Sequence, residues 1–411
     1  MKKMLVIIPD LKSGGAEKSL INFLSVCDSK RYSIDLLLFS HTGTFLHQIP
    51  ESVTLLPLNP ILVRLFSKNQ DEIKTIKKNH QTQYWYGLMI KVLGTAVGKV
   101  LTFGDIYKSR QMRWKIIYHF LIPKMKQHYD IVMAYLEGEC SYYALDKVLA
   151  DRKICWVHSN YNNLGYSARL DKSIFNKADA VVTISDVCIK ALQDNFYEMQ
   201  DRIVRLENIS SEFLVQQKSQ QDKQALVCSD SDVLLSIGRL TYPKGFDLAI
   251  DAAGVLRNKG IQFQWYIIGD GCLRNELEKK ISDLSLEDHV KLLGIKENPY
   301  PYIANCKVFV QPSRYEGKSV VLDEAKILAK PIIVTNYPTV YDQIVDSKEG
   351  IIVEQTPESI AEGIAILLTN DEKREAISEY LSQHHYGNES EIEKYYEVFE
   401  GRSKKDDKEQ E

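Results

Sequence analysis

The stretch from Val308 to Thr335 reads VFVQPSRYEGKSVVLDEAKILAKPIIVT, and its pattern decides the fold. Two short β-branched runs, Val308–Val310 and Ile332–Val334, are typical of buried parallel strands. The apolar spacing between them predicts a short helix that follows a polar loop and that Pro331 ends. A strand, a loop and a helix in this order place unpaired N–H groups and the positive end of the helix dipole at the edge of a sheet. A phosphate can bind there.

Two carboxylates, Glu316 in the loop and Glu324 in the helix, bracket the helix start with seven residues between them. Acidic residues are favoured at helix N-termini for structural reasons alone. The stretch nevertheless resembles the E-x7-E element of the retaining glycosyltransferases of family 4, which have the GT-B fold. The resemblance implies that Glu316 bonds the donor sugar and that Glu324 bonds the ribose of its nucleotide. It also implies that the backbone near Lys318, Ser319 and Val320 faces the diphosphate, although many members have an aromatic residue and a glycine at the first two positions.

Length and composition limit the possible classes of protein. A chain of 411 residues exceeds the size of a single hydrophobic core, so we expect two domains. A net charge of −3 argues against a general nucleic-acid binder. The seven cysteines include no C-x-x-C pair, which favours reduced thiols in a cytoplasmic protein over disulfides or a zinc site. The N-terminal apolar run is too short for a signal peptide, and no window reaches the roughly 18 apolar residues of a membrane span.

The first strand, predicted over 4–8, leads into a loop with Gly14 and Gly15 ahead of a helix predicted over 16–26. We expect the glycines to relieve crowding there and to let bare backbone approach an anionic ligand. A tight strand-to-helix turn explains them equally well. The third glycine of the dinucleotide fingerprint is missing. In the family a Gly-Gly loop after the first strand lies between the donor phosphates and the acceptor, so the resemblance assigns both glycines to the donor site.

A histidine, His158, directly follows the strand predicted over 153–157. This position lies on the rim where ligands bind in open α/β sheets. A single histidine there is more often a structural residue. The family has a histidine in this register near the reacting sugar carbon, so the resemblance implies a catalytic role for His158.

The segment 62–127 differs in character from the rest of the chain, because lysines and arginines far outnumber acids and aromatic residues are interleaved with them. Basic, aromatic-rich helices can lie on an anionic lipid surface. Alternatively, the aromatic residues pack on the sheet and the lysines face water. We favour membrane contact because cations and aromatic residues share the segment, and we rank nucleic acid lower. The aromatic residues are Tyr84, Trp85, Tyr86, Phe103, Tyr107, Trp114, Tyr118 and Phe120.

Two cations follow the strand predicted over 232–237. Arg239 comes directly after the strand and Lys244 stands at a helix entrance, so both can converge on one anion. Arginine can grip a phosphate bidentately, while lysine acts as a point charge. The alternative is two solvated cations in a loop. The family has Arg and Lys at this spacing in a Gly-Arg-Leu…Lys-Gly arrangement that contacts the diphosphate, so the resemblance makes both catalytic.

Further matches concern the nucleotide. The loop that begins at Gly269 resembles the family's Gly-Asp-Gly loop beside the nucleotide, and Ile295 belongs to a stretch that resembles the element bordering the base. A D-x-D triplet at 230–232 is a pattern that can hold a metal-bound nucleotide. It enters a strand, at the end opposite the ligand edge, so we discount it. We therefore expect no metal and no cofactor besides the nucleotide-sugar donor.

The expected architecture is α/β of the GT-B type, with two Rossmann-like doubly wound domains that face each other across a cleft. Further strands are predicted at 33–39, 53–56, 130–134, 180–184, 203–206, 264–268, 290–292 and 350–353. We expect an acceptor-binding domain over 1–210, a linker over 211–231, a nucleotide-sugar domain over 232–385, a helix within 386–402 that returns to the first domain with Ser390 as its N-cap, and a disordered tail over 403–411.

The resemblance implies a retaining, metal-independent glycosyltransferase that moves a sugar from UDP to a carbohydrate hydroxyl. The basic segment suggests a lipid-linked acceptor at the cytoplasmic face of the membrane, as in capsule or other surface-polysaccharide assembly. Two alternatives remain: a UDP-sugar 2-epimerase on the same fold, and a non-catalytic partner that binds nucleotide-sugar. The Arg239…Lys244 and E-x7-E pairing argues against the first, and the intact Glu316, Arg239 and Lys244 argue against the second.

Overall fold

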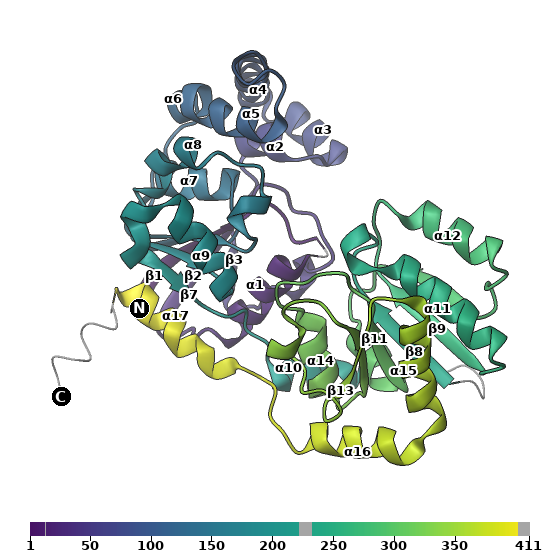
Figure 1. The fold of residues 1–411 in the computed structure, drawn as a ribbon. Coiled ribbons are helices and arrows are strands. Elements are labelled where there is room, and N and C mark those ends of the chain that lie inside the picture. Colours follow the sequence, from purple (N-terminus) through teal and green to yellow (C-terminus); the bar gives the residue numbers. More distant parts are fainter. Residues whose placement is uncertain (13, 222–231, 402–411) are drawn as a thin grey trace, which may run out of the picture. The chain divides into compact units, whose positions relative to one another are not determined.

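The computed structural model describes residues 1–12, 14–221 and 232–401. These residues form two compact units, residues 1–209 with 390–401 (unit 1) and residues 210–389 (unit 2) (Figure 1). Most of the D-x-D triplet at 230–232, much of the predicted linker and the predicted disordered tail lie outside the described residues.

In its described residues, unit 1 contains a parallel sheet of seven strands in the order β3-β2-β1-β4-β5-β6-β7. The run Met4–Ile8 of β1, an inner strand between β2 and β4, is fully buried, which explains its continuous apolar sequence. Alternate residues of β1 enter two different cores, because successive side chains point to opposite faces. The strands are β1 (Lys2–Ile8), β2 (Tyr32–Leu38), β3 (Val53–Leu55), β4 (His128–Ala134), β5 (Leu149–Val157), β6 (Ala180–Thr183) and β7 (Ile203–Arg205).

Helices cover both faces of this sheet. One face packs against α7 (Glu139–Lys147), α8 (Ala168–Phe175) and α9 (Asp186–Asn195). The other face packs against α1 (Gly15–Val26) and the C-terminal α17 (Ile392–Glu400).

The start of α17 differs from the prediction that Ser390 is its N-cap. The N-cap is Glu391, and Ser390 lies in the short 3-10 helix η7 (Glu389–Glu391). A 3-10 turn at a helix start moves the boundary by a residue, and a sequence pattern does not reveal such a shift.

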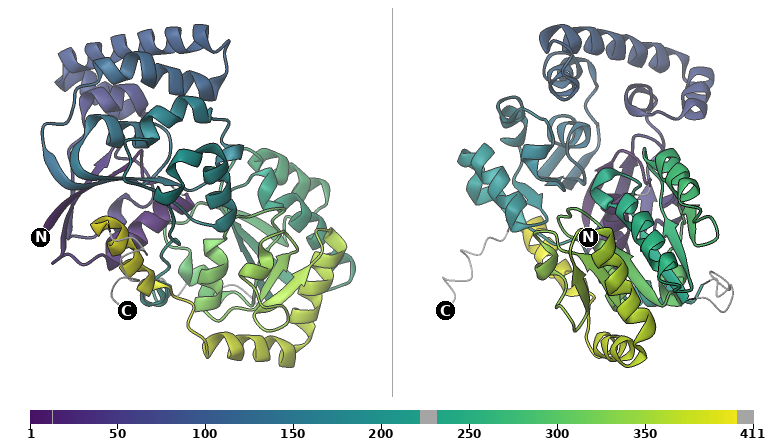
Figure 2. Two further views of the ribbon diagram at one scale, coloured as in Figure 1. Left: turned by 60° about the vertical axis from the view of Figure 1, so that its left-hand side comes forward. Right: turned by 45° about the vertical axis from the view of Figure 1, so that its right-hand side comes forward.

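A helical insertion between β3 and β4 accounts for the basic segment. Its helices gather at one end of unit 1 (Figures 1 and 2). Of its aromatic residues, Tyr84, Trp114 and Tyr118 are buried, so the packing explanation holds for these three. No helix among the described residues is long and apolar enough to cross a membrane. The elements are α2 (Pro60–Phe66), α3 (Gln70–Asn79), α4 (Gln81–Leu101), α5 (Ile106–Arg113), a π-helical turn (Trp114–Tyr118) and α6 (His119–Leu121).

Unit 2 contains, within the part that the structure describes, a parallel sheet of six strands in the order β10-β9-β8-β11-β12-β13. The strands are β8 (Asp232–Ile237), β9 (Phe263–Ile268), β10 (Val290–Gly294), β11 (Val308–Gln311), β12 (Ile332–Thr335) and β13 (Gly350–Val353). The helices are α10 (Glu212–Ser219), α11 (Phe246–Asn258), α12 (Arg274–Asp283), α13 (Tyr300–Asn305), α14 (Val320–Ile327), α15 (Pro357–Thr369) and α16 (Asp371–Ser382).

The predicted linker over 211–231 differs from the structure, because it begins with helix α10. Ser211 caps this helix by accepting a hydrogen bond from the Leu214 N–H group, and Val215 is buried in the core beside α13 and α14. Of the two buried residues of α10, Val215 and Ser219, only Val215 is apolar, so the sequence lacks the apolar period that would indicate a helix.

Candidate active site

Loops at the carboxyl ends of β8, β9 and β11 meet in direct backbone contact. Gly269 has a φ of +146°, and a Cβ placed on it would lie 1.8 Å from the carbonyl oxygen of Gly238. Gly245 has a φ of +65°, and its Cβ would lie 1.9 Å from the carbonyl oxygen of Pro312. No side chain fits at either position, so these glycines allow the three loops to meet.

The centre of this loop cluster is an ion pair between Lys244 and Glu316. The Lys244 Nζ lies 2.6 Å from Oε1 of Glu316, and both side chains are largely buried. The same oxygen accepts hydrogen bonds from Ser313 Oγ at 2.7 Å and Gln311 Nε2 at 2.9 Å. Two of the four predicted catalytic residues are therefore together, and the carboxylate is held by three donors.

A second ion pair fixes the two loops that carry this pair. Arg314 donates bidentately to Asp247, with N–O distances of 2.7 and 2.6 Å, and its guanidinium lies over the ring of Tyr242 at 4.2 Å. Its backbone N–H group donates to the carbonyl of Pro243 at 2.8 Å. Burial raises the pKa of Asp247, but the bonds from Arg314 more than offset this, so the pKa lies below its ordinary value. The sequence analysis did not single out Arg314, although it lies two residues before Glu316.

Arg239 does not converge with Lys244 on one group in this structure. Its side chain is exposed, and within the described residues it makes no ion pair. The main chain beside Arg239 nevertheless lies close to the Lys244–Glu316 pair, because a Cβ on the preceding Gly238 would lie 3.4 Å from Cδ of Lys244. The predicted convergence of the two cations is therefore not seen, since Lys244 bonds Glu316 and Arg239 faces solvent.

The first turn of α14 is held by Gln343, which follows the 3-10 helix η6 (Val340–Asp342). The Ser319 N–H group donates to Oε1 of Gln343 at 2.7 Å, and Nε2 of Gln343 donates to the Ser319 carbonyl at 3.1 Å. The same Nε2 lies 3.3 Å from Oδ1 of Asp323. The predicted exposure of the Ser319 N–H group to a diphosphate is therefore not seen, because Gln343 already occupies it.

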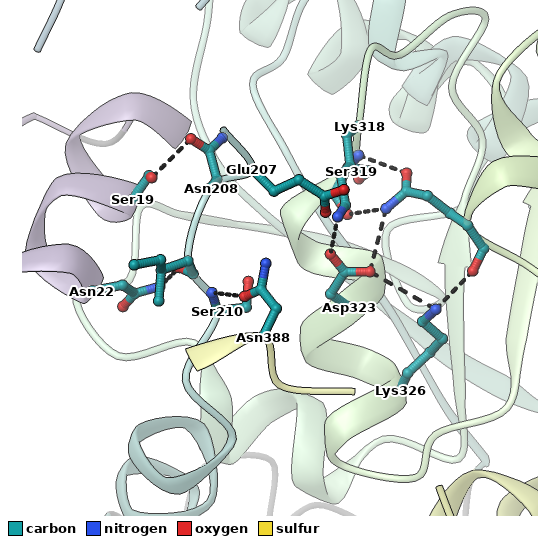
Figure 3. Close-up of polar contacts among 12 residues, drawn as sticks. Ser19, Asn22, Glu207, Asn208, Ser210, Lys318, Ser319, Asp323, Lys326 and Asn388 are labelled. Atoms are coloured by element: carbon teal, nitrogen blue, oxygen red, sulfur yellow. Dashed lines mark hydrogen bonds and ion pairs between the residues drawn. The ribbon is translucent and has the colours of Figure 1, made fainter. Parts of the chain in front are cut away.

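Charged side chains surround this turn, as Figure 3 shows. Lys318 and Lys326 both approach Asp323, at 3.9 and 3.8 Å. Burial raises the pKa of Asp323, against the lowering effect of the two lysines. Val320 begins the helix directly after this turn.

Glu324 occupies a different environment from Glu316. Its side chain is buried, and Oε1 accepts a hydrogen bond from the Tyr300 hydroxyl at 3.2 Å. Burial and the Glu324 charge raise the pKa of Tyr300. Glu324 therefore lies inside the unit, while Glu316 lies in the loop cluster.

The remaining predicted residues of unit 2 lie at the same edge of the sheet. The Gly269 N–H group donates to the Gly294 carbonyl at 2.9 Å, which ties the loop after β9 to the end of β10. Ile295 comes next and its side chain is 43% exposed, so an apolar contact surface is available beside the loop.

In unit 1, Gly14 is the N-cap of α1 and Gly15 is its first residue. A Cβ on Gly15 would meet nothing within 4 Å, and one on Gly14 would meet only the flexible Glu17 side chain. The prediction that Gly15 relieves crowding is therefore wrong. Its backbone faces open space at a helix N-terminus.

His158 follows β5 and stacks on the ring of Trp156, with 5.0 Å between centroids. Burial lowers its pKa to about 4, so the imidazole is neutral at pH 7. Its Nε2 is buried and makes no hydrogen bond to any described residue. Its backbone N–H group donates to Oε2 of Glu137 at 3.2 Å.

Glu137 is a polar residue of this edge that the sequence analysis missed. Burial raises its pKa, although it accepts hydrogen bonds from His158 and Ser159. Its position could have indicated it, because Glu137 comes three residues after β4 and His158 comes directly after the neighbouring strand β5.

Residues 217–384, which make up most of unit 2, match the family described as Glycosyl transferases group 1. Over 231 residues the chain is 30% identical to the N-acetylgalactosamine-N,N'-diacetylbacillosaminyl-diphospho-undecaprenol 4-alpha-N-acetylgalactosaminyltransferase of Campylobacter jejuni. That match covers 54% of this chain and 60% of the relative, and a Streptomyces kanamyceticus alpha-D-kanosaminyltransferase is matched over 56% of its length. The chain thus spans little more than half of the curated relatives it matches.

Solved structures share the fold. HepE from Anabaena in complex with UDP and glucose has a TM-score of 0.63 at 17% identity, over 93% of this chain and 94% of that one. A glycosyltransferase from Rickettsia africae has a TM-score of 0.62 at 17% identity, over 98% and 99%. Residues 217–384 are thus similar to the group 1 glycosyltransferases, and the chain as a whole has the GT-B fold of the solved structures.

Proposed function

We propose that this chain is a retaining, metal-independent glycosyltransferase that moves a sugar from UDP to a hydroxyl of a carbohydrate acceptor. The observation that carries the proposal is the contact between Lys244 and Glu316 in the loop cluster at the carboxyl end of the unit 2 sheet. Ligands bind at this edge in open α/β sheets. A fixed cation beside a carboxylate suits a substrate that joins a diphosphate to a sugar, because the cation binds phosphate and the carboxylate accepts from sugar hydroxyls.

In the proposed reaction, the bond between the anomeric carbon and the β-phosphate oxygen breaks, and its electron pair remains on the phosphate. The acceptor oxygen bonds to the same face of that carbon, and its proton passes to the departing phosphate. Lys244 stabilises the negative charge that develops on the phosphate, and Arg239 closes on the same group when donor is bound. Pre-arranged cations lower the barrier because they need no reorganisation during the reaction.

UDP as donor nucleotide is supported by HepE, a protein of the same fold whose structure holds UDP and glucose. A lipid-linked acceptor is supported by the Campylobacter relative, whose name specifies a diphospho-undecaprenol substrate. We propose that the acceptor is likewise carried on a lipid in polysaccharide or glycoconjugate synthesis, and that the enzyme works at the inner face of the membrane.

The proposal is tested by substituting Lys244. We expect Lys244→Ala to reduce transfer by about a hundredfold or more while the fold remains intact, because removing one charge-stabilising contact typically costs that much. Lys279→Ala, at an exposed lysine of α12, is the control and should keep full activity. Near wild-type turnover by a folded Lys244→Ala protein would remove Lys244 from the mechanism.

Donor, product and metal dependence complete the test. Thermal shifts with UDP-, GDP- and ADP-sugars identify the nucleotide, because a bound ligand raises stability. We expect the largest thermal shift with a UDP-sugar. For an α-linked donor, NMR of the product should show an axial linkage. Activity should be unchanged in EDTA. Release of an epimerised sugar without acceptor would instead indicate a 2-epimerase, and donor binding without turnover would indicate a non-catalytic partner.

A further inference from the structure

Helix α4 carries apolar residues on both its inner and its outer side. Its inner side contacts α2 and the following helices through glycines. A Cβ on Gly94 would lie 2.6 Å from Cε1 of Tyr118, and one on Gly98 would lie 2.6 Å from Oγ of Ser109. The glycines therefore let the helix pack closely on its neighbours, and this packing fixes which side faces outward.

The outer side of α4 is apolar where a surface helix is normally polar. Five large side chains form this side, spaced at i, i+4, i+7, i+8 and i+15, and we call them the α4 stripe. They are 43–73% exposed, as the values for Met89 and Val100 show. Their spacing places them in one row along the helix. The α4 stripe is Trp85, Met89, Val92, Leu93 and Val100.

Further large apolar side chains of the helical insertion are exposed outside α4. Phe103 is 99% exposed, Ile106 is 71% exposed and Phe120 of α6 is 74% exposed. Soluble proteins rarely expose large connected apolar areas unless a partner or a membrane covers them.

Lysines border this surface. The Nζ of Lys77 lies 5.9 Å from the centre of the Trp85 ring, which places a cation from α3 beside the first residue of the stripe. Lys99 of α4 and Lys108 of α5 are exposed near the other end, where Lys108 also pairs with Asp105 at 3.1 Å. An apolar row with a tryptophan and flanking lysines is the pattern of helices that lie in the interface of an anionic bilayer.

We propose that the α4 stripe, with Phe103, inserts into the interface of an anionic lipid bilayer, with α4 lying parallel to the membrane plane. The stripe supplies apolar burial and the lysines supply attraction to anionic headgroups. This inference deepens the proposed function. It rests on that proposal only in assuming that the acceptor is carried on a membrane lipid. A second copy of this chain would cover the apolar row but would bring like-charged lysines together, which disfavours it.

Trp85 provides a specific optical probe. The chain has four tryptophans, and Trp114, Trp156 and Trp265 are fully buried. We expect vesicles of phosphatidylglycerol and phosphatidylcholine to shift the emission of the full-length protein to shorter wavelength, and brominated lipid to quench it. Trp85→Phe should bind the same vesicles without the shift. Binding of wild-type protein without any change in Trp85 emission would overturn the insertion.

The stripe itself is tested with Val92→Gln/Leu93→Gln/Val100→Gln, which changes only exposed positions. We expect the lipid concentration for half-maximal vesicle binding to rise at least about tenfold, since each buried apolar group contributes to interfacial affinity. Val187→Gln, on α9 and 58% exposed like Val92, is the matched control and should bind normally. Transfer to a water-soluble acceptor should be unchanged in both proteins.

The remaining outcomes separate this inference from its alternatives. In the wild type, moderate salt should weaken binding without abolishing it, because salt screens the lysines but not apolar burial. Normal vesicle binding by the triple variant would overturn the proposal, and so would a wild-type dimer that the variant converts to monomer without any vesicle binding. An inactive protein that still binds vesicles through the stripe would refute only the glycosyltransferase function.

Discussion

Lys244 and Glu316 come from loops about 70 residues apart, so their contact depends on how these loops are held. Arg314 holds them, because it bonds Asp247 at the start of α11 and lies over Tyr242. The side chains of Arg314 and Asp247 are both only partly exposed, so their ion pair is more firmly held than an ordinary surface salt bridge. Arg314 is therefore a positioning residue that acts through Lys244 and Glu316.

We expect Arg314→Ala to lower kcat roughly a hundredfold and to change the donor KM much less, because a displacement of about 1 Å at a reacting group can cost that much. Asp247→Ala should have a similar effect, and the double variant should be no worse than either single one, since the two residues act as a unit. Lys307→Ala is the control. Lys307 pairs with Asp232 at 2.6 Å, and this pair lies at the amino ends of β11 and β8, the edge of the sheet opposite the loops. An equal loss in the control, or kcat unchanged in Arg314→Ala, would contradict the role.

His158 should make stability depend on pH. Its pKa is about 4 in the folded protein and about 6.5 in the unfolded chain, so the unfolded chain binds the proton more readily. Stability is complete above pH 6.5 and falls as the pH drops toward 4, by up to about 2 kcal/mol at pH 5. Chemical unfolding at pH 7.5 and pH 5 should show a smaller loss for His158→Gln than for the wild type. Equal losses in both proteins would show that His158 titrates normally.

At the scale of elements, the strands were the most predictable part of the chain. Each predicted strand is present among the described residues, because buried parallel strands need continuous apolar runs such as Met4–Ile8. Helix α10 was missed because only one of its buried residues, Val215, is apolar, and one apolar position gives no periodic signal. The apolar spacing between the strands β11 and β12 predicted helix α14, but not that Gln343 binds its first turn, since this contact joins residues 24 positions apart.

Gln343 therefore offers a test of how the start of α14 is held. We expect Gln343→Ala to destabilise unit 2 by about 1–3 kcal/mol, because it removes the acceptor of the buried Ser319 N–H group. Gln343→Glu keeps this acceptor but loses the donor and places a charge beside Asp323, so it should not restore stability. Gln264→Ala, which removes a bond to the Asp288 carbonyl near the amino end of β9, is the comparison for donor binding and should leave it unchanged. We also expect Gln343→Ala to weaken donor binding. Donor binding equal to that of the wild type would show that the contact between Gln343 and Ser319 does not support the donor site.

At the scale of the whole molecule, the chain crosses between its two units twice, after Ile209 and before Ser390. Helix α17 completes the core of unit 1, where the rings of Tyr395 and Phe399 pack on Phe23 at 5.4 and 5.9 Å. The returning helix within 386–402 was predicted, but only the fold shows which aromatic residues it meets. Folding of unit 1 therefore requires residues from both ends of the chain.

The last prediction follows from this arrangement. Phe399 is fully buried in unit 1, so Phe399→Ala should destabilise unit 1 by about 3–5 kcal/mol, the usual cost of such a cavity. Unit 2 has its own cores and should keep its stability. Two unfolding transitions should then separate in urea, with only one moved to lower concentration. Phe120→Ala, at an exposed phenylalanine of the same unit, is the control and should move neither. A single transition that shifts as a whole would show instead that the two units unfold together, with α17 coupling their stabilities.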